Sequence, residues 1–145
     1  MDFKECVAFA NENRISYLAT DDNGQPRVRP MSLWFADDSG FYFQATTDKA
    51  MCKQLQKNNR VEMCIYAPGS GGTMGKMMRV TGKVEFIEDK TFKIKALKDR
   101  PFLKNTGIET PDDPRLVLFK IYTGEAFFWT MGSSRGDSEN KPITF

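Results

Sequence analysis

Short runs in which apolar and polar residues alternate recur along most of the chain, and this pattern predicts a mainly β protein. Strands are expected over residues 15–20, 27–35, 41–45, 61–67 and 79–88, with a last hairpin of 116–122 and 125–131 that turns at Thr123-Gly124. Turns rich in Asp, Asn and Gly join the first three strands, which predicts an antiparallel meander.

Three helices are expected beside these strands. They cover residues 3–13, 48–58 and 89–99, and Thr47 or Asp48 is the expected N-cap of the second. Helices at these places argue against a plain immunoglobulin-like sandwich, and the chain lacks the strand–helix alternation of a doubly wound sheet. We therefore expect a small antiparallel barrel, mainly β, with helices at its ends.

The chain has 145 residues, which fits a single domain of ordinary size. Residues 1–131 are expected to form that domain. Residues 132–145 are polar and rich in Gly and Ser until the last few positions, so we expect a tail or an arm that a partner orders.

Composition excludes several classes of function. The chain has no histidine, which excludes Ser-His-Asp and Cys-His nucleophiles, histidine-ligated haem and the common histidine-containing zinc sites. A bound organic cofactor is then expected to supply any reactive chemistry, and no metal is expected. The formal net charge of +2 is too small to indicate a nucleic-acid-binding protein.

The cysteines and the apolar runs indicate the cellular compartment in which the protein is expected. Cys6, Cys52 and Cys64 show no CxxC spacing, which is typical of reduced thiols in a cytosolic protein. The first residues lack the pattern of a signal peptide, and no run approaches the roughly 20 apolar residues of a membrane span. We expect a cytoplasmic protein that binds neither membranes nor nucleic acid.

Two segments carry residues suited to an anion. Arg27 and Arg29 lie two positions apart in one strand, so both face the same side, and a charged guanidinium beside apolar residues requires an anion. Thr46, Thr47 and Lys49 open the second helix, where hydroxyls, backbone N–H groups and a lysine suit a phosphate. By residue type alone, ordinary surface charges and a helix cap explain these segments equally well.

The order of these segments also resembles a known family. PRVRPM, GFYFQATTDK, KQLQKNNRVEMCIY and MMRVTGKVEF follow one another as in the pyridoxamine 5′-phosphate oxidase-like family of FMN-binding split barrels, particularly its small bacterial branch. The similarity extends over residues 3–131. It implies a six-stranded antiparallel split β-barrel and a homodimer with FMN at the subunit interface.

The resemblance also assigns cofactor-binding residues by position. Arg29, Pro30, Met31 and Ser32 match the strand that lines the isoalloxazine ring, while Thr46, Thr47 and Lys49 match the phosphate-binding turn, with Lys53 as a second cation. Arg79 matches a strand that faces the cofactor from the other subunit. Trp129 lies where the last strand approaches the flavin, although ordinary packing explains it equally well.

Two departures narrow the activity. Ala50-Met51 occupy the place of the Arg-Lys pair of the true oxidases, and the C-terminal arginine and histidine that hold the substrate phosphate are missing. We therefore do not expect vitamin B6 oxidation. The absence of histidine also argues against a haem-binding relative and against nitroimidazole reductases that use a histidine near the flavin.

The resulting hypothesis is an FMN-dependent oxidoreductase that acts on an unidentified small molecule, with NADH or NADPH as a transient donor and no catalytic side chain assigned. The alternative is a non-catalytic protein that binds flavin or senses redox state through it. The homodimer has support of its own, because Phe127, Phe128, Trp129 and Met131 make the last strand apolar on both faces.

Overall fold

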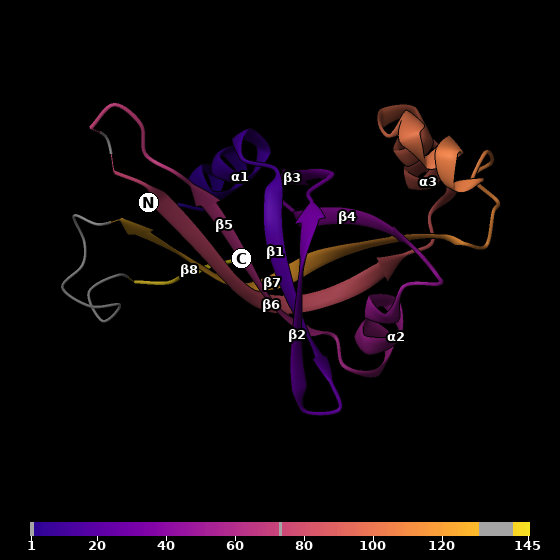
Figure 1. The fold of residues 1–145 in the computed structure, drawn as a ribbon, viewed down its shortest axis with the longest axis horizontal. Helices are drawn as coiled ribbons and strands as arrows, with labels where there is room; N and C mark the ends of the chain where they lie inside the picture. The colour runs from indigo at the N-terminus through magenta and orange to yellow at the C-terminus, as the bar shows by residue number, and fades with distance from the viewer. Residues whose placement is uncertain (1, 73, 131–140) are drawn as a thin grey trace.

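The computed structural model describes residues 2–72, 74–130 and 141–145, and these residues form a single curved antiparallel sheet with helices around it (Figure 1). The sheet runs in the order β2-β1-β5-β6-β7-β4-β3, and β8 pairs with β7. The strands are β1 (Ile15–Asp22), β2 (Gln25–Ser32), β3 (Phe35–Asp37), β4 (Gly40–Thr46), β5 (Arg60–Ala67), β6 (Lys76–Ile87), β7 (Leu116–Thr130) and β8 (Ile143–Thr144). The helices are α1 (Phe3–Glu12), α2 (Ala50–Lys57), α3 (Lys90–Asp99) and the 3-10 helix η1 (Pro101–Thr106).

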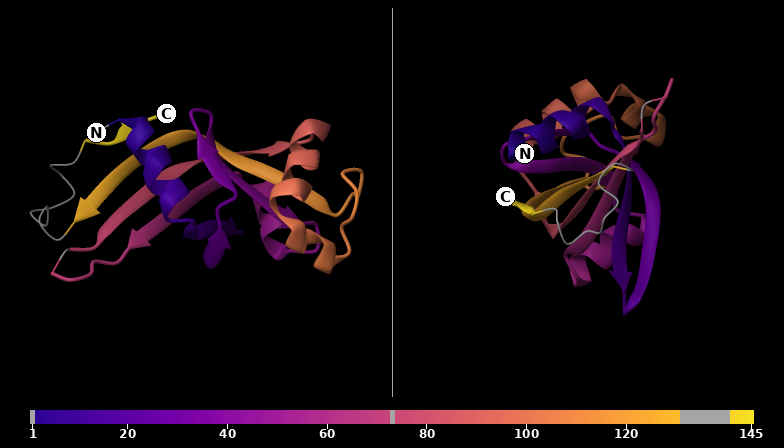
Figure 2. Two further views of the ribbon diagram at one scale, coloured as in Figure 1. Left: turned by 90° about the horizontal axis from the view of Figure 1, so that it is seen from above. Right: turned by 90° about the vertical axis from the view of Figure 1, so that its left-hand side faces the viewer.

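The sheet is an open, split barrel. Six of its strands are long, as expected, and β3 and β8 have only three and two residues. No pairing joins β2 to β3 or β4 among the described residues, so the barrel has a seam between the two ends of the strand order. Figure 2 shows how strongly the sheet twists, with β1 and β2 turned away from the long β6–β7 pair. The predicted fold class is confirmed.

Alternation along the strands separates two faces of the sheet. The inner face carries fully buried side chains such as Leu18, Met63 and Phe43, and α1 and α2 add Phe9 and Leu55 to this core. Because successive side chains of a strand point to opposite faces, the outer face carries the residues between them. Of the helices, α1 and α2 therefore cover the inner face of the sheet.

A second, smaller core lies where α3 and η1 pack against β4. Trp34 and Tyr42 are its large aromatic members, and Leu103 and Ile108 enter from η1 and the segment after it. Trp34 also donates a 3.0 Å hydrogen bond from Nε1 to Asp99 Oδ2 at the end of α3. This cluster holds η1 beside the end of β4.

The predicted meander of three strands is wrong. The strand expected at residues 27–35 is two strands, β2 and β3, which lie at opposite ends of the sheet. The chain leaves β2 at Leu33 and Trp34, which are both buried, and continues in β3, which pairs with β4. Burial of these two side chains in different cores breaks the apparently continuous strand.

The predicted hairpin at Thr123-Gly124 is also wrong, because β7 is one strand of 15 residues. It pairs with β6 from Lys76↔Thr130 to Ile87↔Leu118, with an irregularity in register between Lys83 and Val84. Gly124 lies opposite Gly82, and a Cβ on Gly124 would come within 2.0 Å of the Thr81 carbonyl oxygen. The glycine thus permits close approach of two strands rather than a turn.

The two ends of the chain meet beside the core. The last residue, Phe145, stacks on Phe3 of α1 at 4.5 Å between ring centroids and contacts Phe41 edge-on. Its backbone N–H and carbonyl both bond to Gly124. Residues 143–145 therefore dock on their own chain, whereas 131–140, which include Met131 and most of the expected tail, lie outside the described residues. No helix among the described residues is long and apolar enough to cross a membrane.

Candidate functional site

A cavity of about 760 Å³ lies at the seam of the split barrel. Its walls come from the end of β2, the end of β4, the turn into α2, and η1 with the segment that follows it. This volume is within the range of roughly 300–1,000 Å³ that is usual for small-molecule sites. The seam therefore brings together segments that the sheet order keeps apart.

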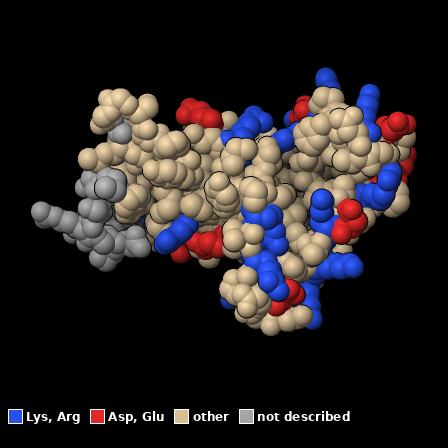
Figure 3. All heavy atoms as spheres, in the orientation of Figure 1, with Lys and Arg blue, Asp and Glu red and all other residues tan. Residues whose placement is uncertain are grey.

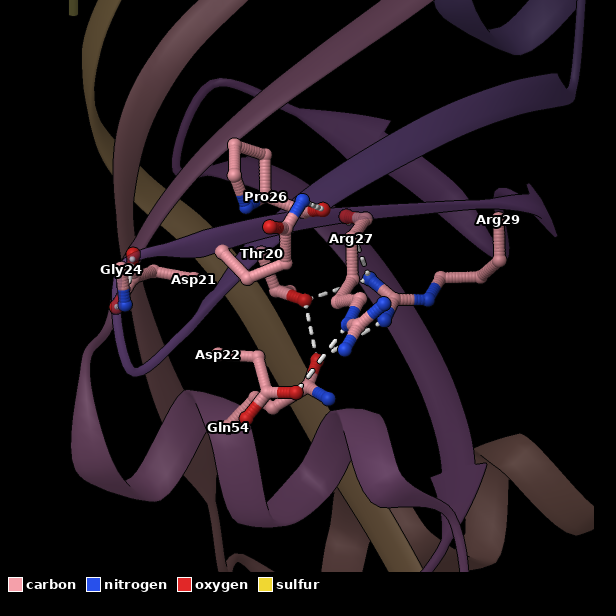
Figure 4. Close-up of polar contacts among 9 residues, drawn as sticks. Thr20, Asp21, Asp22, Gly24, Pro26, Arg27, Arg29 and Gln54 are labelled. Carbon is pink, nitrogen blue, oxygen red and sulfur yellow. Dashed lines mark hydrogen bonds and ion pairs between the residues drawn. The ribbon is translucent and has the colours of Figure 1, made fainter.

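Arg29 provides the positive charge of the β2 wall. Leu18 and Thr20 of β1 lie across from β2 in the register, and the Arg29 guanidinium bonds to the Leu18 carbonyl at 3.1 Å and to Thr20 Oγ1 at 2.7 Å. Its Nη2 donates to Gln54 Oε1 of α2 at 3.0 Å (Figure 4). All of these acceptors are neutral, so the described structure gives Arg29 no carboxylate to balance its charge. Burial lowers the pKa of Arg29, as expected for a cation away from water.

The turn from β4 into α2 forms the next wall. Thr46, Thr47, Asp48 and Lys49 all line the cavity. Lys49 is the N-cap of α2, and no side chain caps this helix end, so the prediction of Thr47 or Asp48 as cap is wrong. Thr46 instead donates its hydroxyl to Asp48, which lowers the pKa of that carboxyl. The uncapped start of α2 therefore directs backbone N–H groups towards this wall.

Arg115, the residue just before β7, is the third cation that lines the cavity. The Thr47 N–H donates to the Arg115 carbonyl at 3.0 Å, which ties the turn to β7. The guanidinium is held by Asp113, with Nε to Oδ1 at 3.1 Å and Nη2 to Oδ2 at 2.6 Å, and it also reaches the Gly107 carbonyl. These bonds raise the pKa of Arg115 and lower that of Asp113 to about 2.

The rest of the lining is largely apolar. Met31 and Met51 approach from β2 and α2, while Phe102 and Ile108 belong to the η1 side, where Phe102 is 47% exposed. Gln44 of β4 is an exception, because its Oε1 atom is buried without a hydrogen-bond partner in the described structure. A buried amide without a partner is costly, so this atom is suited to a ligand that bonds to it.

The cavity contains six of the ten sequence-predicted residues, namely Arg29, Pro30, Met31, Thr46, Thr47 and Lys49. Ser32 lies beyond the lining and accepts a 3.2 Å bond from Arg100, and Lys53 is exposed on α2 outside the lining. Arg79 and Trp129 lie on the outer face of the sheet and do not line the cavity. Their predicted contacts with a cofactor stay predictions.

Sequence reasoning did not identify Gln44, Phe102 or Arg115. Arg115 follows the Pro-rich break at 111–114, and nothing in the sequence indicates that this turn folds back onto the start of α2. Phe102 lies in a segment that the sequence marks only as turn-rich. The sole signal for Gln44 is its polar side chain in an otherwise apolar strand.

The residues present fit a planar ligand that ends in a phosphate. Three cations from three separate elements line the cavity. The carboxylates beside them are Asp48, in the lining, and Asp113, which pairs with Arg115, so a small positive excess remains. Figure 3 shows basic side chains gathered over the region of β2 and α2. Hydroxyls and an uncapped helix start complete a set of donors for an anion. Among the described residues, no group of three acidic or thiol side chains is arranged for a metal ion.

Solved structures share this architecture over nearly the whole chain. A NimC/NimA family protein from Clostridium acetobutylicum is 27% identical with a TM-score of 0.75, and the match covers 98% of this chain and 92% of that one. General stress protein 26 from Bacillus anthracis is 20% identical with a TM-score of 0.69 and complete coverage of both chains. A FAD-binding protein from Mesorhizobium loti is 23% identical with a TM-score of 0.68, covering 88% of this chain and 92% of that one.

Sequence comparison leads to the same group of proteins. The pyridoxine/pyridoxamine 5′-phosphate oxidase of Agrobacterium fabrum is 26% identical over 77 residues, which are 53% of this chain. The match spans about a third (35%) of that enzyme's length. The sequence pattern of the pyridoxamine 5′-phosphate oxidase family matches residues 3–130. Because this match covers nearly all of the split barrel and both segments of the cavity predicted from sequence, the chain belongs to the pyridoxamine 5′-phosphate oxidase family.

Proposed function

We propose that the chain is an FMN-dependent oxidoreductase that acts on a small molecule and takes electrons from NADH or NADPH. The observation that carries this proposal is the convergence of Arg29, Lys49 and the Thr46–Thr47 hydroxyls on one cavity from separate parts of the chain. Membership of the family and the similarity to a FAD-binding protein support a flavin as the ligand.

FMN fits this cavity better than a flavin without a phosphate would. Lys49 and the uncapped start of α2 would hold the phosphate, with the Thr47 hydroxyl as a donor. Thr46 would become a second donor when its hydroxyl turns from Asp48 to the ligand. The apolar side chains of Met31 and Phe102 would face the ring system. Gln44, whose amide oxygen is buried without a partner, would bond to a polar edge of the ligand.

FMN, when bound, would supply two-electron transfer between the nicotinamide donor and the substrate. The task of the protein is then to bind, to orient and to provide a positive field. Arg29 is suited to this last role, because its charge is partly buried and is balanced by no carboxylate in the described structure. A cation in such a place stabilises negative charge more strongly than one in water.

Vitamin B6 oxidation is not part of this proposal. The chain has no histidine, and Arg100, the residue just before η1, is engaged by Ser32 and the Leu33 carbonyl. Arg100 does not line the cavity, so it is not placed to anchor a second phosphate there. We therefore propose a substrate without the phosphate of the B6 vitamers.

Anaerobic reduction tests this proposal directly. Protein loaded with FMN is mixed with NADPH or NADH, and its absorbance near 450 nm is followed, where oxidised flavins absorb. Bleaching that reverses when air is admitted is the expected result. Yellow colour that persists with both donors would contradict a reductase and would favour a protein that only binds or senses flavin.

We also propose that two copies associate through the outer face of β2, β1 and β5. Tyr17 lies between Pro30 and Cys64 in the register, and Val28, which is 68% exposed, lies further along the same face. An exposed apolar face of this kind indicates an interface. Phe127 and Trp129 of β7 extend the face, while Phe128 points into the core.

A second copy of the chain suits this face for two reasons. Arg79 and Glu62 form an ion pair at 3.4 Å on it, so the face presents both charges and is able to complement itself about a two-fold axis. Pro30 belongs to this face and also lines the cavity, so the two surfaces are continuous. A partner on the outer face would thus complete the cavity wall.

A further inference from the structure

We infer that Arg115 is the second cation of the phosphate site and takes over the role of the Arg-Lys pair that the true oxidases carry at the start of the helix. This inference rests on the proposed binding of FMN. It concerns a residue outside every segment that the resemblance to the family marks as cofactor-binding.

Arg115 lies beside the start of α2. It lines the same cavity as Thr46, Thr47 and Lys49, and its neighbour Leu116 pairs with Thr46 in the sheet. A 3.0 Å hydrogen bond from the Thr47 backbone nitrogen to the Arg115 carbonyl oxygen joins the two backbone segments. Any anion at the start of α2 is therefore close to the start of β7.

The guanidinium of Arg115 is held on one side only. Asp113 holds Nε and Nη2, and the Gly107 carbonyl accepts from Nη2 at 2.8 Å. In the described structure Nη1 has no protein acceptor, so its two N–H groups remain for a ligand. Holding one side of a guanidinium reduces the entropy that is lost when the other side binds a phosphate.

Helix α2 itself offers no substitute for the missing Arg-Lys pair. Met51 is buried in the main core with 5% exposure, and Ala50 carries no charge. Lys53 lies on α2 but outside the cavity lining. Lys49 alone is a weak clamp for a dianion, because Asp48 beside it brings a negative charge into the same turn. Arg115 brings a second cation to this wall; its ion pair with Asp113 offsets part of its charge but leaves the Nη1 donors for the phosphate.

Flavin titrations of matched variants test the assignment, with FMN and riboflavin as the two ligands. Riboflavin lacks the phosphate but has the same ring and ribityl chain. Arg115→Ala should weaken FMN binding about tenfold or more, since bonds between charged groups are the strong ones, and should change riboflavin binding less than twofold. Arg115→Lys should recover part of the FMN affinity.

Arg60→Ala is the control. Arg60 is an exposed arginine at the start of a strand, as Arg115 is, but it does not line the cavity. It should leave both affinities unchanged.

Three results would overturn the inference. FMN affinity of Arg115→Ala equal to that of the wild type would exclude a phosphate contact, and equal losses for FMN and riboflavin would assign Arg115 a purely structural role. A wild-type protein that binds neither ligand would overturn the proposed function as well, and the wild-type titration alone distinguishes that case from the other two.

Discussion

Arg29 on β2 and Gln54 on α2 are joined by a hydrogen bond of 3.0 Å from Nη2 to Oε1, although they lie 25 positions apart in the sequence. The same Gln54 oxygen accepts the Thr20 hydroxyl at 2.6 Å. One neutral amide thus fixes the helix against the edge of the sheet and orients the guanidinium without neutralising it (Figure 4). Because Gln54 orients Arg29 without cancelling its positive charge, Arg29 remains available to an anion.

Substitution of Gln54 should therefore separate stability from binding. Gln54→Glu places a carboxylate on Arg29, which should maintain or raise the midpoint of thermal unfolding while weakening FMN binding, because the cation is now paired. Gln56→Glu is the control, since Gln56 is exposed on the same helix and adds the same charge. Unfolding midpoints and fluorescence titrations give the two readouts. A Gln54→Glu variant that binds FMN as tightly as Gln56→Glu would contradict a role for Arg29 in anion binding.

Lys49 should matter to FMN binding more than other lysines do. Lys49→Ala removes a cavity-lining cation at the N-cap of α2, and we expect a loss of affinity of about 0.5–2 kcal/mol, as for removal of a partly exposed charged donor. Lys93→Ala removes a lysine of α3 that pairs with Glu88 at 3.6 Å and lies outside the cavity lining. Fluorescence titration compares the two, and equal FMN affinities would refute the assignment of Lys49.

Acid should loosen the segment that holds Arg115. The pKa of Asp113 falls from its ordinary value of 3.8 to about 2, chiefly through the side-chain hydrogen bond from Arg115. A carboxyl whose folded-state pKa is lowered stabilises the fold above its unfolded pKa, and this contribution is lost as pH falls through the folded pKa. Between pH 4 and pH 2 the wild type should lose stability more steeply than Asp113→Asn. Parallel unfolding curves across this window would show that the Asp113–Arg115 pair does not form.

Cys64 should report on the proposed dimer. Burial raises the pKa of all three thiols, that of Cys6 to about 11, and Cys6 and Cys52 are buried, whereas Cys64 is half-buried on the outer face. A thiol reagent should modify Cys64 first, and the rate should increase on dilution as copies dissociate. Light scattering on the same samples gives the mass. A monomer at micromolar concentration, with a labelling rate independent of dilution, would contradict the dimer.

Much of the fold follows from local patterns. Local patterns of apolar residues locate β1, β4 and β5 within a few positions. In β1 and β5 alternate side chains are buried, and β4 also buries Tyr42 in the second core. The positions of β2 and β3 do not follow, since only the burial of Leu33 and Trp34 in different cores separates them. Gly124 is ambiguous in the sequence, because a glycine favours a turn and also permits close approach of two strands. Gly124 lies opposite Gly82 in the β6–β7 pair, which allows close approach of the strands and not a turn. The sequence alone does not reveal that these two glycines face each other.

The candidate site also contains some residues that are predictable from the sequence and others that are not. Residues that belong to one continuous segment, such as Arg29–Met31 and Thr46–Lys49, are recognisable from their types and order. Arg115 and Phe102 reach the cavity only because the second core docks η1 beside the end of β4. Cavity walls built by long-range packing leave no local pattern in the sequence.

The most direct test of the account is a titration of the purified, flavin-free protein with FMN, followed by flavin fluorescence and the visible absorbance spectrum. We predict a saturable change that reaches its end point at one FMN per chain and a yellow protein that retains the flavin through gel filtration. A colourless protein whose addition leaves the spectrum and fluorescence of FMN unchanged, even at large excess, would contradict the central claim that the seam of this split barrel is a flavin site.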